Sequence, residues 1–276
     1  MPRTLRARLN APGLVVAPGC HDALGARILE QAGFEAVYMT GNGLSAAMLG
    51  APDLGLLTLT EMASRARAIA ASISVPLIAD ADTGYGNLNN VARTIAEYEA
   101  AGVAALHLED QVTPKKCGAM SGLSLVPAEE HAEKIRHAVK MRRNPDMLII
   151  GRTDARLVLG LDEAIARGKA YAEAGADLVL IEMLQSEEEM RRAVRSIDAP
   201  MMFNSVDGRT PPLDAAAFEA IGFKLLAFPL SATLAYARLM QRFASDLNQN
   251  GSTATWADEL MPIHDYEGVL GLSRYA

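Results

Sequence analysis

The sequence predicts an α/β protein, a single (β/α)8 TIM barrel followed by a C-terminal helical segment. Short apolar runs rich in β-branched residues alternate with longer Ala/Glu/Arg segments of helical period, and eight such pairs fit into 276 residues. The apolar runs are nearly continuous, which is typical of parallel strands covered on both faces. Eight β/α units in this length describe a barrel, because such barrels commonly reach about 250 residues as one domain.

The elements follow one another in a regular order. The expected strands cover residues 14–18, 36–40, 76–82, 105–110, 148–154, 178–183, 201–204 and 224–229. The expected helices cover residues 23–32, 61–71, 88–101, 128–143, 161–174, 187–196, 213–221 and 232–247. His131 and His137 lie six residues apart on one of these helices, hence not on one face, and we interpret both as solvated. Residues 248–255 are polar, so we expect a barrel over 1–247 and a linker with a C-terminal segment over 248–276, packed on the barrel or on a neighbouring subunit.

A doubly wound sheet is the competing fold. The stretch GNGLSA at residues 41–46 fits the dinucleotide-binding pattern G-x-G-x-x-A directly after an expected strand. The residues that follow do not fit a dinucleotide-binding unit, because the turn-forming stretch APDLG at residues 51–55 leaves too little chain for a crossover helix. The acid about twenty residues further on, Glu61, stands at a helix start rather than at a strand end. The barrel is therefore favoured over the dinucleotide fold.

Composition excludes several classes of protein. Half of the residues are hydrophobic and 21% are charged, which argues against a disordered chain, and two cysteines cannot form a disulfide scaffold. The net charge of -7 gives no electrostatic footprint for nucleic acid or anionic lipid, and charged residues or prolines interrupt every apolar run before membrane-spanning length. The basic N-terminus leads into Ala-Pro-Gly instead of an apolar signal region. We therefore expect a cytoplasmic protein with Cys20 and Cys117 as free thiols.

Polar residues gather where the expected strands end, at the mouth where barrels hold their active sites. Strand periodicity places Asp80 and Asp82 on one side, and likewise His107 and Glu109. Carboxylates that converge at one mouth repel one another unless a cation compensates them. Without a Cys/His cluster of zinc spacing, Mg²⁺ or Mn²⁺ is favoured. Any single acid could instead cap a helix or pair with an arginine, but the pair Asp80 and Asp82 indicates function.

A long segment of low periodicity, residues 111–126, follows the fourth strand. Loops of this length are uncommon unless they form a lid or a binding loop. Lys115 and Lys116 would lower the pKa of the adjacent Cys117 thiol and attract an anionic substrate. An ordinary surface loop with an incidental thiol explains the same spacing equally well.

Seven short motifs together resemble the isocitrate lyase/phosphoenolpyruvate mutase superfamily, over essentially the whole barrel. They are PGCHDA at 18–23, YMTG at 38–41, APDLG at 51–55, DADTGYGN at 80–87, HLEDQ at 107–111, KKCG at 115–118 and GRTDA at 151–155. The resemblance implies a (β/α)8 barrel whose eighth helix is often swapped between subunits of a dimer within a tetramer. It further implies Mg²⁺-dependent chemistry on small α-keto or 2-hydroxy carboxylates through an enolate-like intermediate.

The resemblance also implies roles for individual residues. Asp80 is similar to the direct metal ligand, and the acids that hold the metal mainly through water correspond to Asp53, Asp82 and Glu109. Backbone amides around Thr40, Gly41 and Asn42 would bind the substrate carboxylate. Further pocket positions correspond to Tyr38, His107, Arg152, Glu182 and Asn204.

The chemical steps involve two of these positions and two residues of the loop after the fourth strand. Arg152 would pair with carboxylate or enolate oxygen, for which its fork of donors is well suited. Cys117 corresponds to the lyase cysteine that protonates the departing enolate carbon, and Lys115 to a lysine of the same gating loop. Tyr38 is a candidate for the base that takes the hydroxyl proton.

Two departures from the lyase pattern leave the activity open. Ala119 stands where lyases usually carry histidine after KKCG, and Asn42 replaces a common glycine. Three hypotheses therefore remain. The first is a C–C lyase of a methylisocitrate-like or dimethylmalate-like substrate, and the second is an oxaloacetate decarboxylase or acetylhydrolase on the same metal site. The third is a catalytically silent oligomer that binds metabolites. The intact Asp80, Asp82, Glu109 and Arg152 argue against the third.

Overall fold

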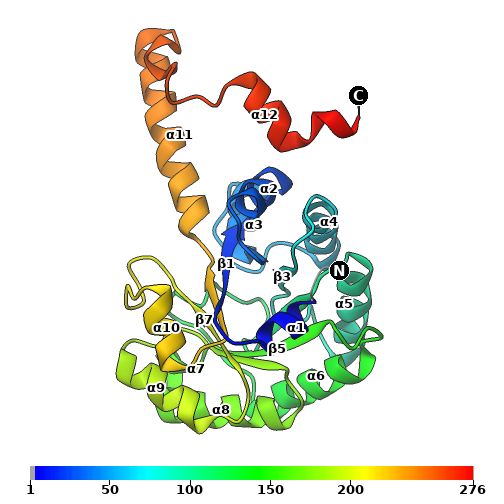
Figure 1. Ribbon diagram of the computed structural model, residues 1–276. Coiled ribbons are helices and arrows are strands. Elements are labelled where there is room, and N and C mark those ends of the chain that lie inside the picture. The colour runs from blue at the N-terminus through cyan, green and yellow to red at the C-terminus, as the bar shows by residue number, and fades with distance from the viewer. Residues whose placement is uncertain (1–3, 276) are drawn as a thin grey trace.

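The computed structural model describes residues 4–275 and contains a closed barrel of eight parallel strands in sequence order (Figure 1). The strands are β1 (Val15–Cys20), β2 (Val37–Met39), β3 (Leu77–Asp80), β4 (Ala105–Glu109), β5 (Leu148–Thr153), β6 (Leu178–Ile181), β7 (Met201–Asn204) and β8 (Leu225–Phe228). Strand β1 pairs with both β2 and β8, which closes the sheet. The predicted TIM barrel is confirmed, and the doubly wound alternative is wrong.

Helices precede, connect and follow the strands. They are α1 (Leu5–Leu9), α2 (Ala23–Gln31), α3 (Gly41–Leu49), α4 (Leu59–Ala70), α5 (Leu88–Ala100), α6 (Ala128–Met141), α7 (Ala155–Leu159), α8 (Leu161–Glu173), α9 (Glu187–Ser196), α10 (Ala215–Ile221), α11 (Ser231–Asn250) and α12 (Ile263–Leu270). All eight predicted helices are present, with ends shifted by up to three residues. Among the described residues, no helix is long and apolar enough to cross a membrane.

Three short helices, α1, α3 and α7, lie outside the prediction, whereas α12 lies in the predicted C-terminal helical segment. Helix α1 buries Leu5 and Leu9 against the apolar interior of the barrel. Helix α3 contains the GNGLSA stretch, and the hydroxyl of Thr40 accepts a hydrogen bond from Gly43 N at its start. The crossover from β2 to β3 is then made by α4, so the glycines belong to a helix start at the barrel mouth.

His131 is buried, contrary to the prediction that it is solvated. Its Nε2 lies 3.1 Å from the carbonyl oxygen of Leu108, and its ring packs edge-on against Tyr171 with ring centroids 4.7 Å apart. The i to i+6 spacing correctly separates His131 from His137, but it does not say which of the two faces the barrel.

The burial of His131 predicts a pH-dependent stability. Burial lowers the pKa of His131 from 6.5 to about 4, so the unfolded chain binds more protons between these values. The folded state therefore loses stability as the pH falls through this window, by about 2 kcal/mol at pH 5 from this group alone. We expect His131→Gln, which keeps a donor for Leu108, to gain about this much relative to the parent between pH 7.5 and pH 5. Urea unfolding of the variant and the parent at both pH values measures the difference in their free energies of unfolding. The same difference at pH 7.5 and at pH 5 would contradict the prediction.

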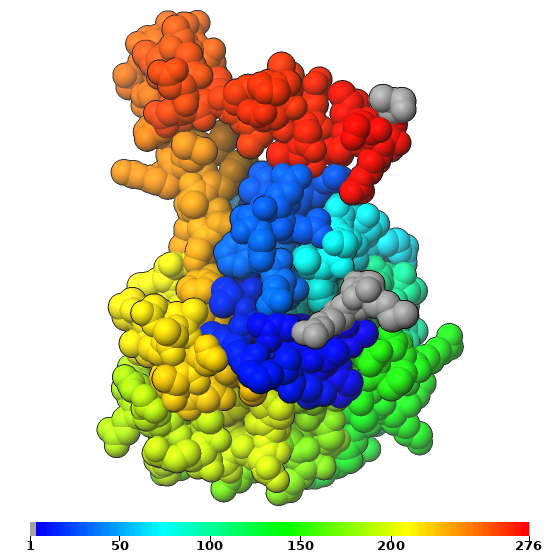
Figure 2. Space-filling view, in the orientation of Figure 1, coloured from blue at the N-terminus to red at the C-terminus, as the bar shows by residue number. Residues whose placement is uncertain are grey.

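The last long helix, α11, projects from the barrel as an arm and buries none of its side chains (Figures 1 and 2). Tyr236 and Leu239 are 55% and 49% exposed. Beyond α11 the chain turns back, so that α12 contacts α2. In a (β/α)8 barrel the eighth helix normally packs against the barrel, whereas α11 contacts β1 and extends away from the barrel beyond it.

We propose that α11 packs on a neighbouring subunit, as the resemblance implies, in a homotetramer built as a dimer of dimers. An apolar surface of this kind is expected at an interface. Analytical ultracentrifugation should give a multiple of the 29.4 kDa chain mass, and Leu239→Asp should lower that mass. The control is Gln249→Asp, which adds the same charge at an exposed position of α11. A parent protein that sediments as a monomer would refute the proposal.

Candidate active site

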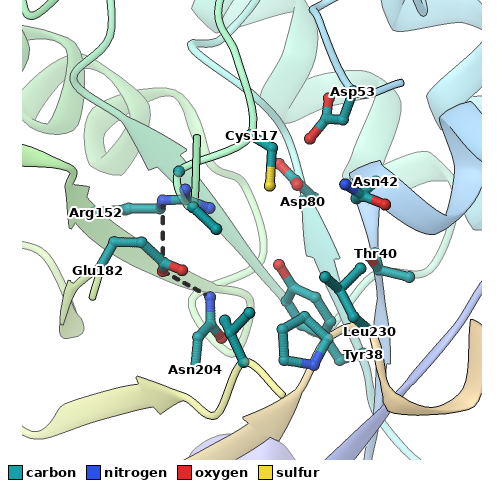
Figure 3. Close-up of a pocket in the computed structure, with 14 residues that line it drawn as sticks. Tyr38, Thr40, Asn42, Asp53, Asp80, Cys117, Arg152, Glu182, Asn204 and Leu230 are labelled. Atoms are coloured by element: carbon teal, nitrogen blue, oxygen red, sulfur yellow. Dashed lines mark hydrogen bonds and ion pairs between the residues drawn. The ribbon is translucent and has the colours of Figure 1, made fainter. Parts of the chain in front are cut away.

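The predicted site residues meet in a pocket at the carboxyl ends of the strands (Figure 3). Those that line it directly are Tyr38, Thr40, Asn42, Asp53, Asp80, Cys117, Arg152, Glu182 and Asn204. Those that contact the lining residues are Gly41, Asp82, His107, Glu109 and Lys115. The cavity measures about 30 Å³, room for one or two water molecules. The structure therefore shows the mouth closed by loop 111–126.

The segment after β2 presents a helix start to the pocket. Thr40 and Asn42 line the pocket at the first turn of α3, where backbone N–H groups lack intrahelical partners and suit an anionic ligand. Gly41 lies so close to Asp80 that a Cβ there would stand 2.5 Å from Oδ2 of Asp80. This glycine lets the helix start approach the candidate metal ligand.

Three buried side chains form a candidate metal group. Asp80, His107 and Glu109 each offer one ligand atom, and these atoms lie within 4.8 Å of one another. Asp80 and Glu109 are predicted ligands, whereas His107 is predicted for substrate binding. The other two predicted acids lie beside Lys115, whose Nζ is 2.8 Å from Oδ2 of Asp53 and 3.0 Å from Oδ1 of Asp82. The alternation of His107 and Glu109 on β4 is the signal that could have joined His107 to this group.

The unsatisfied groups of this cluster fit a cation. Neither carboxylate oxygen of Glu109 has a hydrogen-bond partner in the part of the chain that the structure describes, and its nearest cation is Arg152, with Nη1 3.4 Å away. Burial raises the pKa of Glu109 well above its ordinary value, despite Arg152 and Lys115. Carboxylate oxygens are the donors that Mg²⁺ and Mn²⁺ prefer. The residues present therefore fit a hard divalent cation.

The charges of the pocket are unbalanced. Buried carboxyl groups here are those of Asp53, Asp80, Asp82, Glu109, Asp154 and Glu182, and the buried cations beside them are Lys115 and Arg152. Burial, together with Asp80 and Asp53, raises the pKa of Asp82 to about 6 despite Lys115. Burial lowers the pKa of His107 to about 4, so its imidazole is neutral and adds no compensating charge at neutral pH.

Arg152 is held by acids on several sides. Its Nε and Nη2 donate to Oδ1 of Asp154 at 3.1 and 2.9 Å, and its Nε lies 3.9 Å from Oε2 of Glu182. Asn204 Nδ2 donates to the same Glu182 oxygen at 2.9 Å, as Figure 3 shows. Asp154, two residues after Arg152, is a further candidate site residue, and the sequence pattern alone gave it no role. Its position at the end of β5 was the available signal.

Tyr38 and His107 form a buried pair. The hydroxyl of Tyr38 lies 2.6 Å from Nε2 of His107. Burial, with Asp80 nearby, raises the pKa of Tyr38 well above 10. Tyr38 is therefore a phenol at neutral pH and not a phenolate.

The loop brings Cys117 into the pocket but does not lower its pKa. Burial raises the pKa of the Cys117 thiol above 9. Lys115 is turned toward Asp53 and Asp82, and the exposed Lys116 donates through Nζ to the carbonyl oxygen of Gly122. The prediction that the adjacent lysines lower this pKa is wrong, because desolvation of the thiolate outweighs the pull of cations that are engaged elsewhere. The reading of residues 111–126 as an ordinary surface loop is also wrong, because Lys115 is buried and Cys117 lines the pocket.

A barrel whose mouth gathers acids, an arginine and a thiol is an enzyme site, and comparisons with known proteins identify its class. Residues 5–248 match the family model described as phosphoenolpyruvate phosphomutase. The 2,3-dimethylmalate lyase of Eubacterium barkeri is 47% identical over 271 residues, which cover 98% of this chain and 94% of that protein.

Two solved structures extend the comparison. Oxaloacetate acetylhydrolase in complex with the inhibitor 3,3-difluorooxalacetate has a TM-score of 0.93 at 38% identity, over 99% of this chain and 94% of that one. Phosphonopyruvate hydrolase in complex with oxalate and Mg²⁺ has a TM-score of 0.90 at 32% identity, over 99% and 96%. The chain therefore belongs to the phosphoenolpyruvate phosphomutase family, within the isocitrate lyase/phosphoenolpyruvate mutase superfamily. The predicted superfamily and the predicted class, a lyase, are confirmed.

Proposed function

We propose that the protein is a Mg²⁺-dependent lyase that cleaves a C–C bond of a small 2-hydroxy dicarboxylate, releasing pyruvate or a related α-keto acid. The observation that carries the proposal is the thiol of Cys117 in the same pocket as Asp80 and Arg152. A lyase needs an acid that can protonate the departing carbon. A thiol that is protonated at neutral pH, as burial makes this one, meets that need.

The pocket offers separate groups for binding. The N–H groups at the start of α3 would receive the carboxylate beside the carbinol carbon. Arg152 would receive the carboxylate of the departing half, where negative charge develops as the bond breaks. Asp80 and Glu109 would hold Mg²⁺, with Asp53 and Asp82 around its waters. When bound, Mg²⁺ supplies positive charge to the oxygens that become the keto acid.

Bond cleavage requires two proton movements. The hydroxyl oxygen loses its proton and becomes the carbonyl oxygen, while the electron pair of the C–C bond moves to the departing carbon as an enolate. Cys117 then gives that carbon the thiol proton. Tyr38 can take the hydroxyl proton as it passes its own proton to Nε2 of His107, 2.6 Å away. Such a relay avoids a free phenolate, in keeping with the raised pKa of Tyr38.

The apolar part of the pocket lining favours an alkyl-substituted dicarboxylate over a tricarboxylate. It consists of Ala119, Val206, Pro229 and Leu230. Arg152, the one cationic side chain among the described lining residues, is already paired with acids. The guanidinium group beside Ala119, that of Arg209, already donates through Nη2 to the carbonyl oxygen of Ala119, so a third carboxylate would have to displace that bond, whereas methyl groups would be well accommodated. The 47% identity with a 2,3-dimethylmalate lyase points the same way.

A substrate panel tests the proposal. We expect pyruvate release from 2,3-dimethylmalate or a close methyl-substituted malate to exceed that from 2-methylisocitrate by at least about tenfold in kcat/KM. Activity should vanish with EDTA and return with added Mg²⁺. Turnover that survives EDTA would exclude the metal role, and preference for 2-methylisocitrate would exclude the dicarboxylate assignment.

The second candidate is an oxaloacetate acetylhydrolase or decarboxylase on the same metal site. It is favoured by the close fit to oxaloacetate acetylhydrolase, at a TM-score of 0.93. Decarboxylation needs a stabilised enolate but no carbon acid at the position of Cys117. Release of oxalate and acetate, or of CO₂, from oxaloacetate in preference to cleavage of any malate derivative would establish this alternative.

A further inference from the structure

Gln111 links the loop that closes the pocket to the arginine inside it. It lies two residues after the end of β4 and is 2% exposed. Its Oε1 accepts a hydrogen bond from Lys116 N at 2.9 Å, and its Nε2 donates to Lys116 O at 2.8 Å. One side chain thus pairs both backbone groups of the residue between Lys115 and Cys117. The backbone that presents the thiol is thereby tied to the barrel.

The second hydrogen of the same amide points to the interior. Nε2 of Gln111 donates to Oδ2 of Asp154 at 2.6 Å, while Oδ1 of Asp154 accepts from Arg152. A series of hydrogen bonds therefore connects the backbone of Lys116, through Gln111 and Asp154, to the guanidinium group of Arg152. The bond from Gln111 to Asp154 is buried and the two bonds to Lys116 are partly buried, and a lost partner is costly where water does not reach.

The interior end of this chain is fixed from the other side. Asp110 Oδ1 accepts a hydrogen bond from Asp154 N at 2.9 Å. Asp110 Oδ2 accepts from Thr153 Oγ1 at 2.6 Å, Tyr171 OH at 2.7 Å and Arg167 Nη1 at 3.0 Å. The barrel end of the linkage is therefore held by several buried hydrogen bonds, whereas Lys116 lies on the exposed surface of the loop.

A second contact joins the loop to the same arginine. A Cβ at Gly118 would collide with Nη2 of Arg152 and would stand 2.8 Å from Oδ1 of Asp154. The loop backbone therefore packs directly on the guanidinium group when the pocket is closed. The closed position of the loop and the orientation of Arg152 depend on each other.

We propose that Gln111 is a positioning residue that makes closure of loop 111–126 and alignment of Arg152 one concerted event. This proposal rests on the proposed function, in which Arg152 binds the carboxylate of the departing half of the substrate. The linkage has a consequence for the open state: there Gln111 loses Lys116, Asp154 loses a donor that was oriented by that contact, and Arg152 becomes free to turn. In the closed state, by contrast, Arg152 is aligned at the same time as Cys117 enters the pocket.

Two substitutions at Gln111 test the linkage against simple packing. Gln111→Glu keeps the shape of the side chain but loses both donated bonds and places a second carboxylate against Asp154. Gln111→Ala loses shape and bonds without adding charge. We expect kcat to fall about tenfold in the alanine variant and further in the glutamate variant. A residue that only fills space would give the opposite order, because the glutamate variant retains the volume.

Hydrogen exchange provides a readout that needs no turnover. With Mg²⁺ and oxalate as the probe, we expect amides of residues 112–124 to exchange about tenfold faster in both variants than in the parent, while those of β4 and β5 stay unchanged. The control is Ser121→Ala, which changes an exposed side chain of the same loop outside the linkage. This control should match the parent in kcat and in exchange.

The reciprocal measurement keeps the test decisive if either Gln111 variant fails to fold. Arg152→Lys loses the two-pronged contact with Asp154, so loop exchange should rise in that variant as well. Parent-like exchange in Arg152→Lys, or a glutamate variant milder than the alanine variant, would overturn the proposal. Faster loop exchange in a protein that cleaves no malate derivative would uphold the linkage and refute the proposed function instead.

Discussion

Replacing Asp80 with asparagine is expected to abolish Mg²⁺ binding and to lower turnover by about 10³-fold or more. Asp80 lies in the buried group with His107 and Glu109, and the variant removes one negative charge while keeping the shape of the side chain. Burial alone would raise the pKa of Asp80, but His107, Lys115 and Arg152 hold it below its ordinary value. Asp80 is therefore ionised at neutral pH, and the parent presents a carboxylate where the variant presents a neutral amide.

The Asp80→Asn variant should remain folded. Oδ1 of Asp80 accepts a hydrogen bond from Asp82 N at 3.0 Å, and the amide oxygen of asparagine can accept the same bond. Isothermal titration calorimetry with Mg²⁺ measures the binding, and circular dichroism checks the fold. The control is Asp198→Asn, the same chemical change at an exposed position after α9. Mg²⁺ affinity equal to that of the parent would remove Asp80 from the metal site.

Replacing Cys117 with serine is expected to lower lyase kcat by about 10²-fold or more, with little change in KM. The serine hydroxyl fits the same place, but it is a much weaker acid than a thiol and protonates a carbon poorly. The thiol lines the pocket, and Figure 3 shows its sulfur directed toward the space beside Asp80 and Arg152. Substrate binding depends on other groups, so the loss should appear in the chemical step.

The second cysteine supplies the control for Cys117→Ser. Cys20 is buried at the end of β1, does not line the pocket, and has a pKa raised to about 12, chiefly by burial. Cys20→Ser should therefore keep the parent kcat per folded molecule, even if its unfolding midpoint falls. Parent-like lyase turnover in Cys117→Ser would reject the thiol as the proton donor and would favour a reaction without carbon protonation.

The strands and the barrel mouth could be predicted because their signals are local. Parallel strands buried on both faces appear as apolar runs, and strand periodicity places Asp80 at one end of β3 beside His107 of β4. Helices α1 and α7 span five residues each, which is too short for a periodic pattern. Contacts distant in sequence stabilise them, as when α1 buries Leu5 and Leu9 in the barrel interior.

The electrostatics of the site could not be predicted from spacing. The adjacency of Lys115 and Cys117 in the chain suggested a lowered thiol pKa, but the pKa depends on where the ammonium group points and on how much water reaches the sulfur. Lys115 Nζ lies beside Asp53, 62 residues away in sequence. Asp154 was overlooked for the same reason, since its role depends on contacts with Gln111 and Arg152 that only the folded chain shows.

The small closed cavity has a consequence for the rate of the reaction. A space of about 30 Å³ cannot hold a six-carbon acid such as 2,3-dimethylmalate, so we expect each catalytic cycle to include one opening and one closing of the loop. The loop carries the thiol, so solvent that reaches the pocket during opening meets an enzyme with its proton donor withdrawn. Reopening of the loop is then expected to limit kcat, and kcat should decrease as solvent viscosity increases.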